Sequence, residues 1–337
     1  MFSINGNILK INGHFLYTDL EYNPLNLPPF TIRVRTNDGN PPTGTYKIDS
    51  TLVPGTTDVY DVYKPNEYWW GTVQGATNIV EVLGANTKGV KMMEQVFLDC
   101  SALTSVALFD TSSVKSFYRM FDGTRIRSVP LFNTSNATKT TFMFANCTRL
   151  TSVPRFNTSN VTAMGSMFKG CTRLTTVPQM DTSKVTDMSR MFCQCTQLVT
   201  PPQMETSRVT DMSSMFDGCE QLGSVPLYDT KNVTRMDRMF YDCIRLYSIP
   251  PFDMTSLERM EYMCYNIPIR SIPALNPVAI FIMDYAFYGT ACVQSGALDL
   301  YNRVKNLASF HEGTFRGCGK NTTTGSAELA QIPSDWK

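Results

Sequence analysis

Hydrophobic residues recur along the middle of the chain with a period of 24 residues. The clearest sign is a Met-Phe pair that is followed three residues later by cysteine and six residues later by leucine. Copies of this pair occur at 143–144, 167–168, 191–192, 215–216 and 239–240. Val-Pro or Ile-Pro follows at 153–154, 177–178, 225–226 and 249–250. Such self-similarity indicates a repeat protein in which each unit buries its apolar side against its neighbours.

Two segments of each unit predict secondary structure. Leu-x-x-Val-Pro predicts a short strand that ends at the proline, because proline cannot donate to a strand ladder. The clearest copy of the other segment is Met-Asp-Thr-Ser-Lys-Val-Thr-Asp-Met, from Met180 to Met188. Its Val, Met and Met-Phe positions are three residues apart, which favours a 3-10 or α turn. We therefore predict an α/β leucine-rich-repeat solenoid of about 24 residues per coil, with short parallel strands, short helical or 3-10 turns and buried Met, Phe, Cys, Leu and Val ladders.

The period predicts three regions: a small β-rich N-terminal domain or cap over 1–75, the solenoid over 76–290, and a C-terminal cap with a degenerate last repeat over 291–337. In the first region Asn-Gly at 5–6 and 12–13 predicts hairpin turns. Alternating segments at 31–35, 46–52 and 58–63 predict strands. The tryptophan pair at 69–70 is expected to seal the exposed end of the solenoid; a ligand platform is the alternative.

The spacing of apolar residues in the C-terminal cap predicts one amphipathic helix, around residues 295–307. Helical spacing places one apolar face along it, formed by Ala297, Leu298, Tyr301, Val304 and Leu307. We expect this face to be buried against the last repeat.

The repeat string Met-Phe-x-x-Cys-x-x-Leu-x-x-Val-Pro-x-Phe-Asp-Thr-Ser-x-Val-Thr-x-Met resembles the BspA-type leucine-rich repeats of bacterial surface proteins. It is most similar to the Asp-Thr-Ser-Asn-Val-Thr-Asp-Met variant of bacterial and mycoplasmal surface proteins, and it covers residues 79–290. The resemblance implies adhesion and host contact. Similar arrays also occur in surface or fibre proteins of gut bacteriophages, and the chain shows neither a signal peptide nor a wall anchor.

Charge and composition limit the kinds of partner that the chain is expected to bind. The chain has 42% hydrophobic residues, enough for a substantial core. Its 30 basic and 29 acidic residues give no broad basic field, so we expect neither nucleic acid nor membrane insertion. Only two histidines occur and no motif of a catalytic or nucleotide-binding site is present, so we expect a protein that is not an enzyme and has no cofactor.

Cysteines and acidic residues recur with the same period. Seven of the ten cysteines fall on one repeated position, which favours buried free thiols over disulfides or zinc. Cys193 and Cys195 form the one local pair and leave a redox or metal role open. A second series combines carboxylates and amides: Asp110, Asn133, Asn157, Asp181, Glu205, Asp229 and Asp253. Side-chain-to-backbone turns explain it better than calcium binding, so we expect no metal.

Exposed variable positions are the expected binding residues of such an array. One row follows the cysteines and consists of Arg149, Arg173, Gln197, Gln221 and Arg245. A second row follows the prolines and includes Arg155, Gln179 and Gln203. Tyr247 adds a stacking group. These side chains suit a glycan or a protein surface; an ordinary solvated surface is the alternative.

These features together predict a non-enzymatic surface binding or adhesion module. Its most plausible form is a phage virion structural or receptor-binding protein that recognises a host-surface protein or glycan. The alternatives are an exported bacterial surface adhesin and a structural spacer that contacts only other virion proteins. The expected location is the virion or the extracellular surface.

Overall fold

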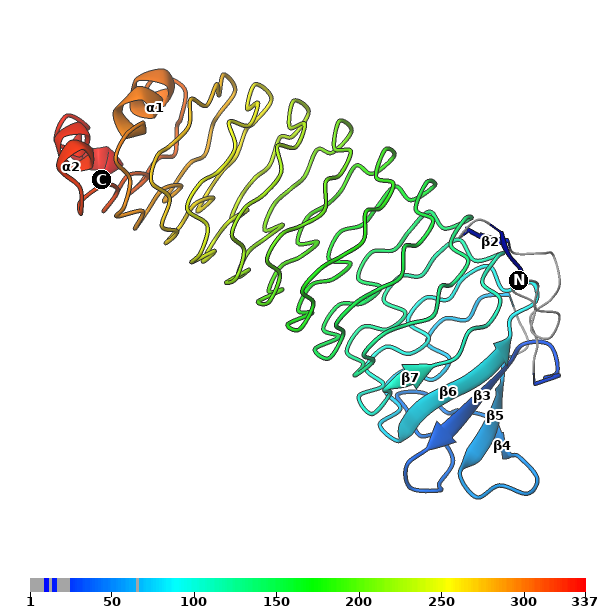
Figure 1. The fold of residues 1–337 in the computed structure, drawn as a ribbon. Helices are drawn as coiled ribbons and strands as arrows, with labels where there is room; N and C mark the ends of the chain where they lie inside the picture. The colour runs from blue at the N-terminus through cyan, green and yellow to red at the C-terminus, as the bar shows by residue number, and fades with distance from the viewer. Residues whose placement is uncertain (1–8, 12–13, 17–24, 65–66) are drawn as a thin grey trace.

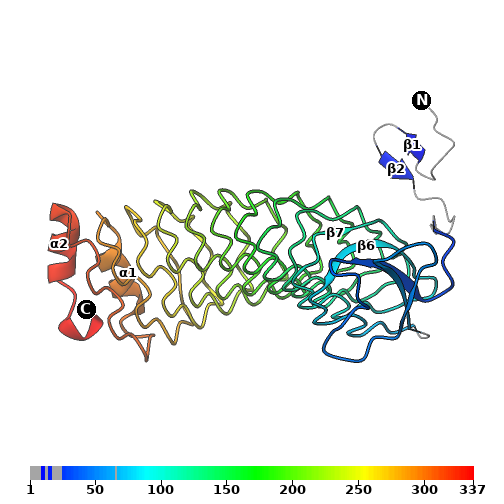
Figure 2. The same ribbon diagram turned by 90° about the horizontal axis from the view of Figure 1, so that it is seen from below.

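The structure is a computed structural model that describes residues 9–11, 14–16, 25–64 and 67–337. Strands lie near the N-terminus and helices near the C-terminus, and between them the chain runs through successive similar loops (Figures 1 and 2). Two strands, β1 (Leu9–Ile11) and β2 (His14–Leu16), pair with each other in antiparallel orientation. The predicted turns at Asn5-Gly6 and Asn12-Gly13 lie outside the described residues.

The N-terminal region is built on one mixed sheet with the strand order β4-β5-β3-β6-β7. Its members are β3 (Thr31–Thr36), β4 (Ser50–Leu52), β5 (Val59–Tyr63), β6 (Ile79–Asn86) and β7 (Ser105–Val106). All pairs are antiparallel except β6 with β7. The strands predicted at 31–35 and 58–63 are confirmed, and the one predicted at 46–52 is shorter.

The prediction of an α/β leucine-rich-repeat solenoid is wrong. Among the described residues the regular strands belong to the β1-β2 pair and the mixed five-stranded sheet. In the described ranges helical structure is limited to α1 (Ala297–Val304), α2 (Thr323–Ala330) and the 3-10 segment η1 (Ser334–Trp336). Between Val106 and Ala297 successive repeats pair only through isolated parallel bridges. Nearly all of these lie in the polar segment before Met-Phe, as in Ala163↔Asp187, and not in the predicted Leu-x-x-Val-Pro strand.

A recurring left-handed residue explains why neither strand nor helix forms in the repeats. The backbone φ is 59° at Phe142 and 55° at Asn146. The Met143 N–H donates to the Thr140 carbonyl at 3.0 Å, whereas the Phe142 N–H donates to the Gly165 carbonyl of the next repeat at 3.1 Å. An i+3 to i bond with positive φ at i+2 is the feature of a type II turn. Hydrogen bonds therefore alternate between local turns and the next repeat.

The second left-handed position of each repeat carries residue types that tolerate it. Asparagine, aspartate and glycine enter this region with least strain. The position is occupied in succession by Asn146, Gly170, Gln194, Gly218, Asp242, Asn266 and Gly289, and Gln194 is the one exception to these residue types. The period of the sequence thus encodes a backbone conformation as well as a core.

The predicted core ladders are confirmed. The Met, Phe, Cys, Leu and Val positions of the central repeats are buried. Phenylalanine rings of neighbouring repeats stack nearly parallel with centroids 5.4–5.9 Å apart, along Phe97, Phe121, Phe144, Phe168, Phe192, Phe216 and Phe240. One continuous hydrophobic cluster therefore runs from the sheet to the C-terminal helices.

The two tryptophans at the N-terminal end play different parts. Trp69 is buried, but Trp70 is 46% exposed, so the prediction that both seal the end is wrong for Trp70. Tyr68 already forms a parallel bridge with Met92, one repeat before Ser116. The first repeat-like segment therefore begins before Ile79, the first residue that sequence periodicity indicated.

The C-terminal helix is confirmed with a different apolar face. α1 buries Ala297, Leu300 and Val304, while Leu307 is 38% exposed. The helix ends at Val304, so Leu307 no longer follows its periodicity. Beyond it, the Trp336 ring stacks on His311 at 4.0 Å and covers the last repeat.

Candidate ligand-binding surface

All the predicted binding residues fall in five equivalent segments. These are 148–155, 172–179, 196–203, 220–227 and 244–251, which together we call the Leu-Pro surface. In each segment the leucine points into the core and its neighbours face solvent: Leu174 is buried, whereas Arg173 and Thr175 are exposed. Extended backbone turns successive side chains to opposite sides, so the buried leucine fixes the outward direction of the flanking residues.

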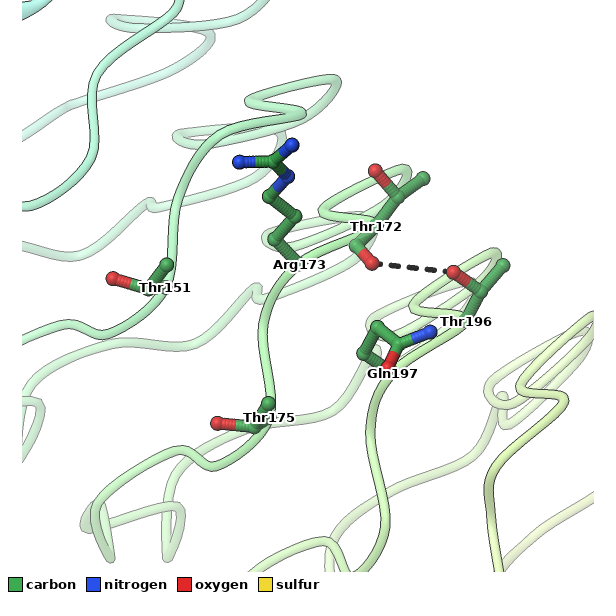
Figure 3. Close-up of a pocket in the computed structure, with 6 residues that line it drawn as sticks. All are labelled: Thr151, Thr172, Arg173, Thr175, Thr196 and Gln197. Atoms are coloured by element: carbon green, nitrogen blue, oxygen red, sulfur yellow. Dashed lines mark hydrogen bonds between the residues drawn. The ribbon is translucent and has the colours of Figure 1, made fainter.

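One depression on this surface combines two of the predicted residues. It is lined by Thr151, Thr172, Arg173, Thr175, Thr196 and Gln197 (Figure 3). Arg173 and Gln197 extend from neighbouring repeats, and Thr151 and Thr175 lie on one side of them (Figure 3). The depression is shallow and open, which suits an extended ligand that lies across several repeats.

Backbone hydrogen bonds orient the threonines of the depression. The Thr196 hydroxyl donates to the Thr172 carbonyl at 3.2 Å, and the Thr172 hydroxyl donates to the Thr148 carbonyl at 3.4 Å. The Thr151 hydroxyl donates to the Arg127 carbonyl at 3.2 Å. A hydroxyl that donates internally keeps its acceptor capacity, while the guanidinium of Arg173 offers donors only. The depression therefore offers a polar ligand both hydrogen-bond acceptors, from the threonine hydroxyls, and donors, from Arg173.

The Leu-Pro surface has more basic than acidic side chains. Its five segments contain four arginines and one acidic residue, Glu220. Within the described part of the chain none of these arginines, Arg149, Arg155, Arg173 and Arg245, forms an ion pair.

Two arginines in or beside the Met-Phe segments are paired instead. Arg238 pairs with Asp217 at 2.9 Å, and Arg119 pairs with Asp122 at 2.8 Å. The Leu-Pro surface therefore carries a net positive charge, although the total charge of the chain is close to zero.

The other predicted residues lie on the same surface outside the depression. Arg155, Gln179, Gln203 and Arg245 are exposed, and Arg149 and Gln221 are half-buried.

Tyr247 is 52% exposed and stands at the position equivalent to Thr151 and Thr175. The guanidinium carbon of Arg270 lies 5.7 Å from its ring centroid. Neither Arg270 nor the lining threonines were among the predicted residues, although the 24-residue recurrence of threonine at 148, 172 and 196 could have indicated the latter.

The model of one protein family matches most of the repeats. It is described as "Mycoplasma protein of unknown function, DUF285" and matches residues 71–179 and 173–272, more than half of the chain. The chain belongs to this family. The match supports the coarser part of the resemblance, a bacterial surface family built from repeats, and does not extend to the BspA-type motif. A search of the curated proteins found no match to the chain.

The repeated cysteines of this DUF285 chain are free thiols in the core. The Cys147 Sγ donates to the Phe121 carbonyl at 3.0 Å, and equivalent bonds recur in the following repeats. Burial raises the pKa of Cys147 to about 12 and that of Cys193, which is also buried, to about 11. Both stay protonated at neutral pH, and a protonated thiol is a poor nucleophile and metal ligand.

The acidic and amide series of the DUF285 repeats shapes turns. The Asp181 carboxylate accepts the Ser183 N–H at 3.0 Å and the Ser183 hydroxyl at 2.7 Å, and Asn157 accepts the same pair of bonds from Ser159. These bonds lower the pKa of Asp181 below its ordinary value. Over the described residues no group of three His, Cys, Asp or Glu side chains is placed to hold a metal ion. No helix described in the structure is long and apolar enough to cross a membrane.

Proposed function

We propose that this DUF285 protein is a non-enzymatic binding module whose Leu-Pro surface recognises an acidic glycan on a cell surface. The observation that carries the proposal is the net positive charge of the repeated Leu-Pro segments, whose four arginines form no ion pair with any described residue. An unpaired guanidinium keeps five donors for external carboxylate or sulfate groups.

Repetition favours a linear ligand. Hydrogen-bonded strands lie about 4.8 Å apart, and the repeats are joined by bonds of the same kind. Arg149 and Arg173 occupy the same position in adjacent repeats, and Gln197 continues the row. A linear chain with regularly spaced acceptors could engage several repeats at once, so that weak contacts would add to useful affinity.

Display on a virion or extracellular surface is the second part of the proposal. It rests on the likeness of the repeat to BspA-type adhesion repeats and to repeats in phage surface proteins. Antibody labelling of purified virions tests the phage form, and virions without the protein would contradict it. A genomic leader in frame with the chain would favour the exported adhesin instead.

A charge-matched pair of double variants tests the binding surface. Arg149→Ala with Arg173→Ala removes two charges from the Leu-Pro surface. The control, Arg208→Ala with Lys231→Ala, removes two charges from exposed positions elsewhere. Binding to immobilised heparin, polygalacturonate, hyaluronan and neutral dextran is then measured at increasing salt.

We expect at least one acidic polymer to bind, with an affinity that falls as salt screens the charges. The surface variant should bind at least about ten-fold more weakly, as for a loss of about 1.4 kcal/mol, and the control should bind like the wild type. Equal binding by the two variants would contradict the proposal. Binding to a host protein and to none of the polymers would favour protein recognition.

A further inference from the structure

A second pocket lies between the five-stranded sheet and the first repeat-like segment. It has a volume of about 410 Å³ and is lined by residues from the loop before β4, the end of β5 and the segment 70–72. It shares no residue with the Leu-Pro surface. Its walls combine aromatic and polar side chains, which is the usual composition of a small-ligand site.

Three partly exposed aromatic residues line this pocket. Tyr46 is 50% exposed, Tyr63 54% and Trp70 46%, and the centroids of Tyr46 and Trp70 are 5.6 Å apart at an angle of 48°. Tyr46 and Trp70 come from segments 24 residues apart that the fold brings together. Two tilted rings form a wall that a flat apolar face of a ligand can cover.

Backbone contacts hold the two aromatic segments in place. The Thr45 N–H donates to the Gln74 carbonyl at 2.8 Å, and the Lys64 ammonium donates to the Trp70 carbonyl at 2.8 Å. A Cβ added to Gly44 would lie 2.4 Å from the Gln74 carbonyl oxygen. Only glycine permits this approach, so the position of Tyr46 is built into the chain.

A buried polar group in the pocket lacks a partner. Thr72 is 8% exposed and lines the pocket, and its hydroxyl has no hydrogen-bond partner among the described residues. The side-chain oxygen of nearby Gln74 is also buried and unpartnered there. Buried polar groups are nearly always satisfied. Thr72 lines the pocket, so a ligand hydroxyl that reached its Oγ1 would supply the missing hydrogen bond.

We propose that this pocket binds a hexopyranose unit of a glycan. A pyranose ring carries C–H groups on its faces, which pack on aromatic rings, and hydroxyls around its edge, which bind polar groups. Tyr46 and Trp70 supply the aromatic surface, and Thr72 and Asp49 supply hydrogen-bonding groups. Lys47 pairs with Asp49 at 3.2 Å, and Lys64 leaves the pocket lining with one net positive charge, which disfavours an organic cation. A wholly apolar ligand would leave Thr72 unsatisfied.

Tryptophan fluorescence gives a direct assay. The chain has three tryptophans, and Trp69 and Trp336 are buried, so Trp70 is the exposed one. The probes are methyl glycosides of glucose, galactose, mannose and N-acetylglucosamine, with tetramethylammonium chloride as a cationic competitor. We expect at least one glycoside, and not the cation, to protect Trp70 from acrylamide quenching.

Variants assign the effect to the pocket. Thr72→Val keeps the side-chain shape and removes the hydroxyl, and it should weaken binding about ten-fold as followed by fluorescence, a loss of about 1.4 kcal/mol. Saturation-transfer NMR on Trp70→Ala should show loss of binding, and Trp70→Phe should retain part of it. Phe281→Ala removes an exposed aromatic far along the chain and serves as the control.

Three outcomes would overturn the inference: no glycoside protects Trp70, tetramethylammonium protects it instead, or Thr72→Val binds like the wild type. Thr72→Val also keeps the assay decisive if Trp70→Ala fails to fold. The variant Arg149→Ala with Arg173→Ala should leave protection of Trp70 unchanged. The two sites can therefore fail independently of each other.

Discussion

The ring of Phe192 stacks on the ring of Phe216 with centroids 5.7 Å apart and planes 6° from parallel. Both side chains are fully buried, and both belong to the Met-Phe pairs that define the period. Stacks of this kind connect one repeat only to its neighbours. Stability in such arrays comes from each unit and from its contacts with adjacent units.

Truncation of a central ring should cost much of the stability. Phe192→Ala removes a ring that contacts Phe168 on one side and Phe216 on the other. We expect a loss of about 3–5 kcal/mol in the free energy of unfolding, because a cavity remains in the core. Urea denaturation measures it, with Leu227→Ala, at a 59% exposed position, as the control. A loss below about 1 kcal/mol would show that the core collapses around the gap.

At positions with positive φ, replacing glycine by alanine should lower the stability, and replacing another residue by glycine should raise it. Gly218 has a φ of 72°, and a Cβ there would meet nothing nearer than 3.5 Å, so Gly218→Ala tests backbone strain alone. We expect it to destabilise by about 1 kcal/mol. The equivalent Gln194→Gly, at a φ of 61°, should stabilise by up to about 1 kcal/mol. Urea midpoints give both values, and equal shifts of the same sign would contradict the strain argument.

Protonation of the carboxylates that shape the turns should lower the stability of the fold at acid pH. Hydrogen bonds from Ser183 and Thr255 hold the pKa of Asp181 and of Asp253 below their ordinary value of 3.8. Their contribution is fully present above that value and is lost as pH falls through the lowered pKa of the folded state. Between pH 6 and about pH 2, the double variant Asp181→Asn with Asp253→Asn should lose less free energy of unfolding than the wild type, as measured by urea denaturation.

The asparagines at the equivalent positions 133 and 157 show that an amide can make the same turn. The double variant should therefore fold normally at neutral pH. An unchanged acid response in that variant would assign the pH dependence to other carboxylates.

Thiol labelling should separate one cysteine from the rest. Cys292 is exposed and the other nine cysteines are buried. We expect an aromatic disulfide reagent to label one thiol in the native protein and all ten in denaturant. Cys292→Ser should leave the native protein unlabelled. Rapid labelling of several native thiols would contradict the buried ladder.

Periodicity in the sequence was sufficient to predict the register of the repeats and the identity of their core. A side chain such as Phe192 or Cys195 recurs every 24 residues because each repeat meets its neighbour at the same place. Local alternation likewise predicted β3 and β5, and helical spacing predicted α1. These properties depend on residues close in sequence or on strict repetition, so sequence alone reveals them.

Tertiary structure decided the rest. The backbone of each repeat alternates local turns with bonds to the next repeat, and positions such as Phe142 adopt positive φ because those neighbouring bonds hold them there. Whether an arginine is paired, as Arg238 is and Arg173 is not, depends on carboxylates in other repeats. Trp70 meets Tyr46 only because the sheet folds back on the first repeat. Contacts between distant segments, such as Trp70 with Tyr46, do not follow the period, so the sequence alone could not predict the pocket that they form.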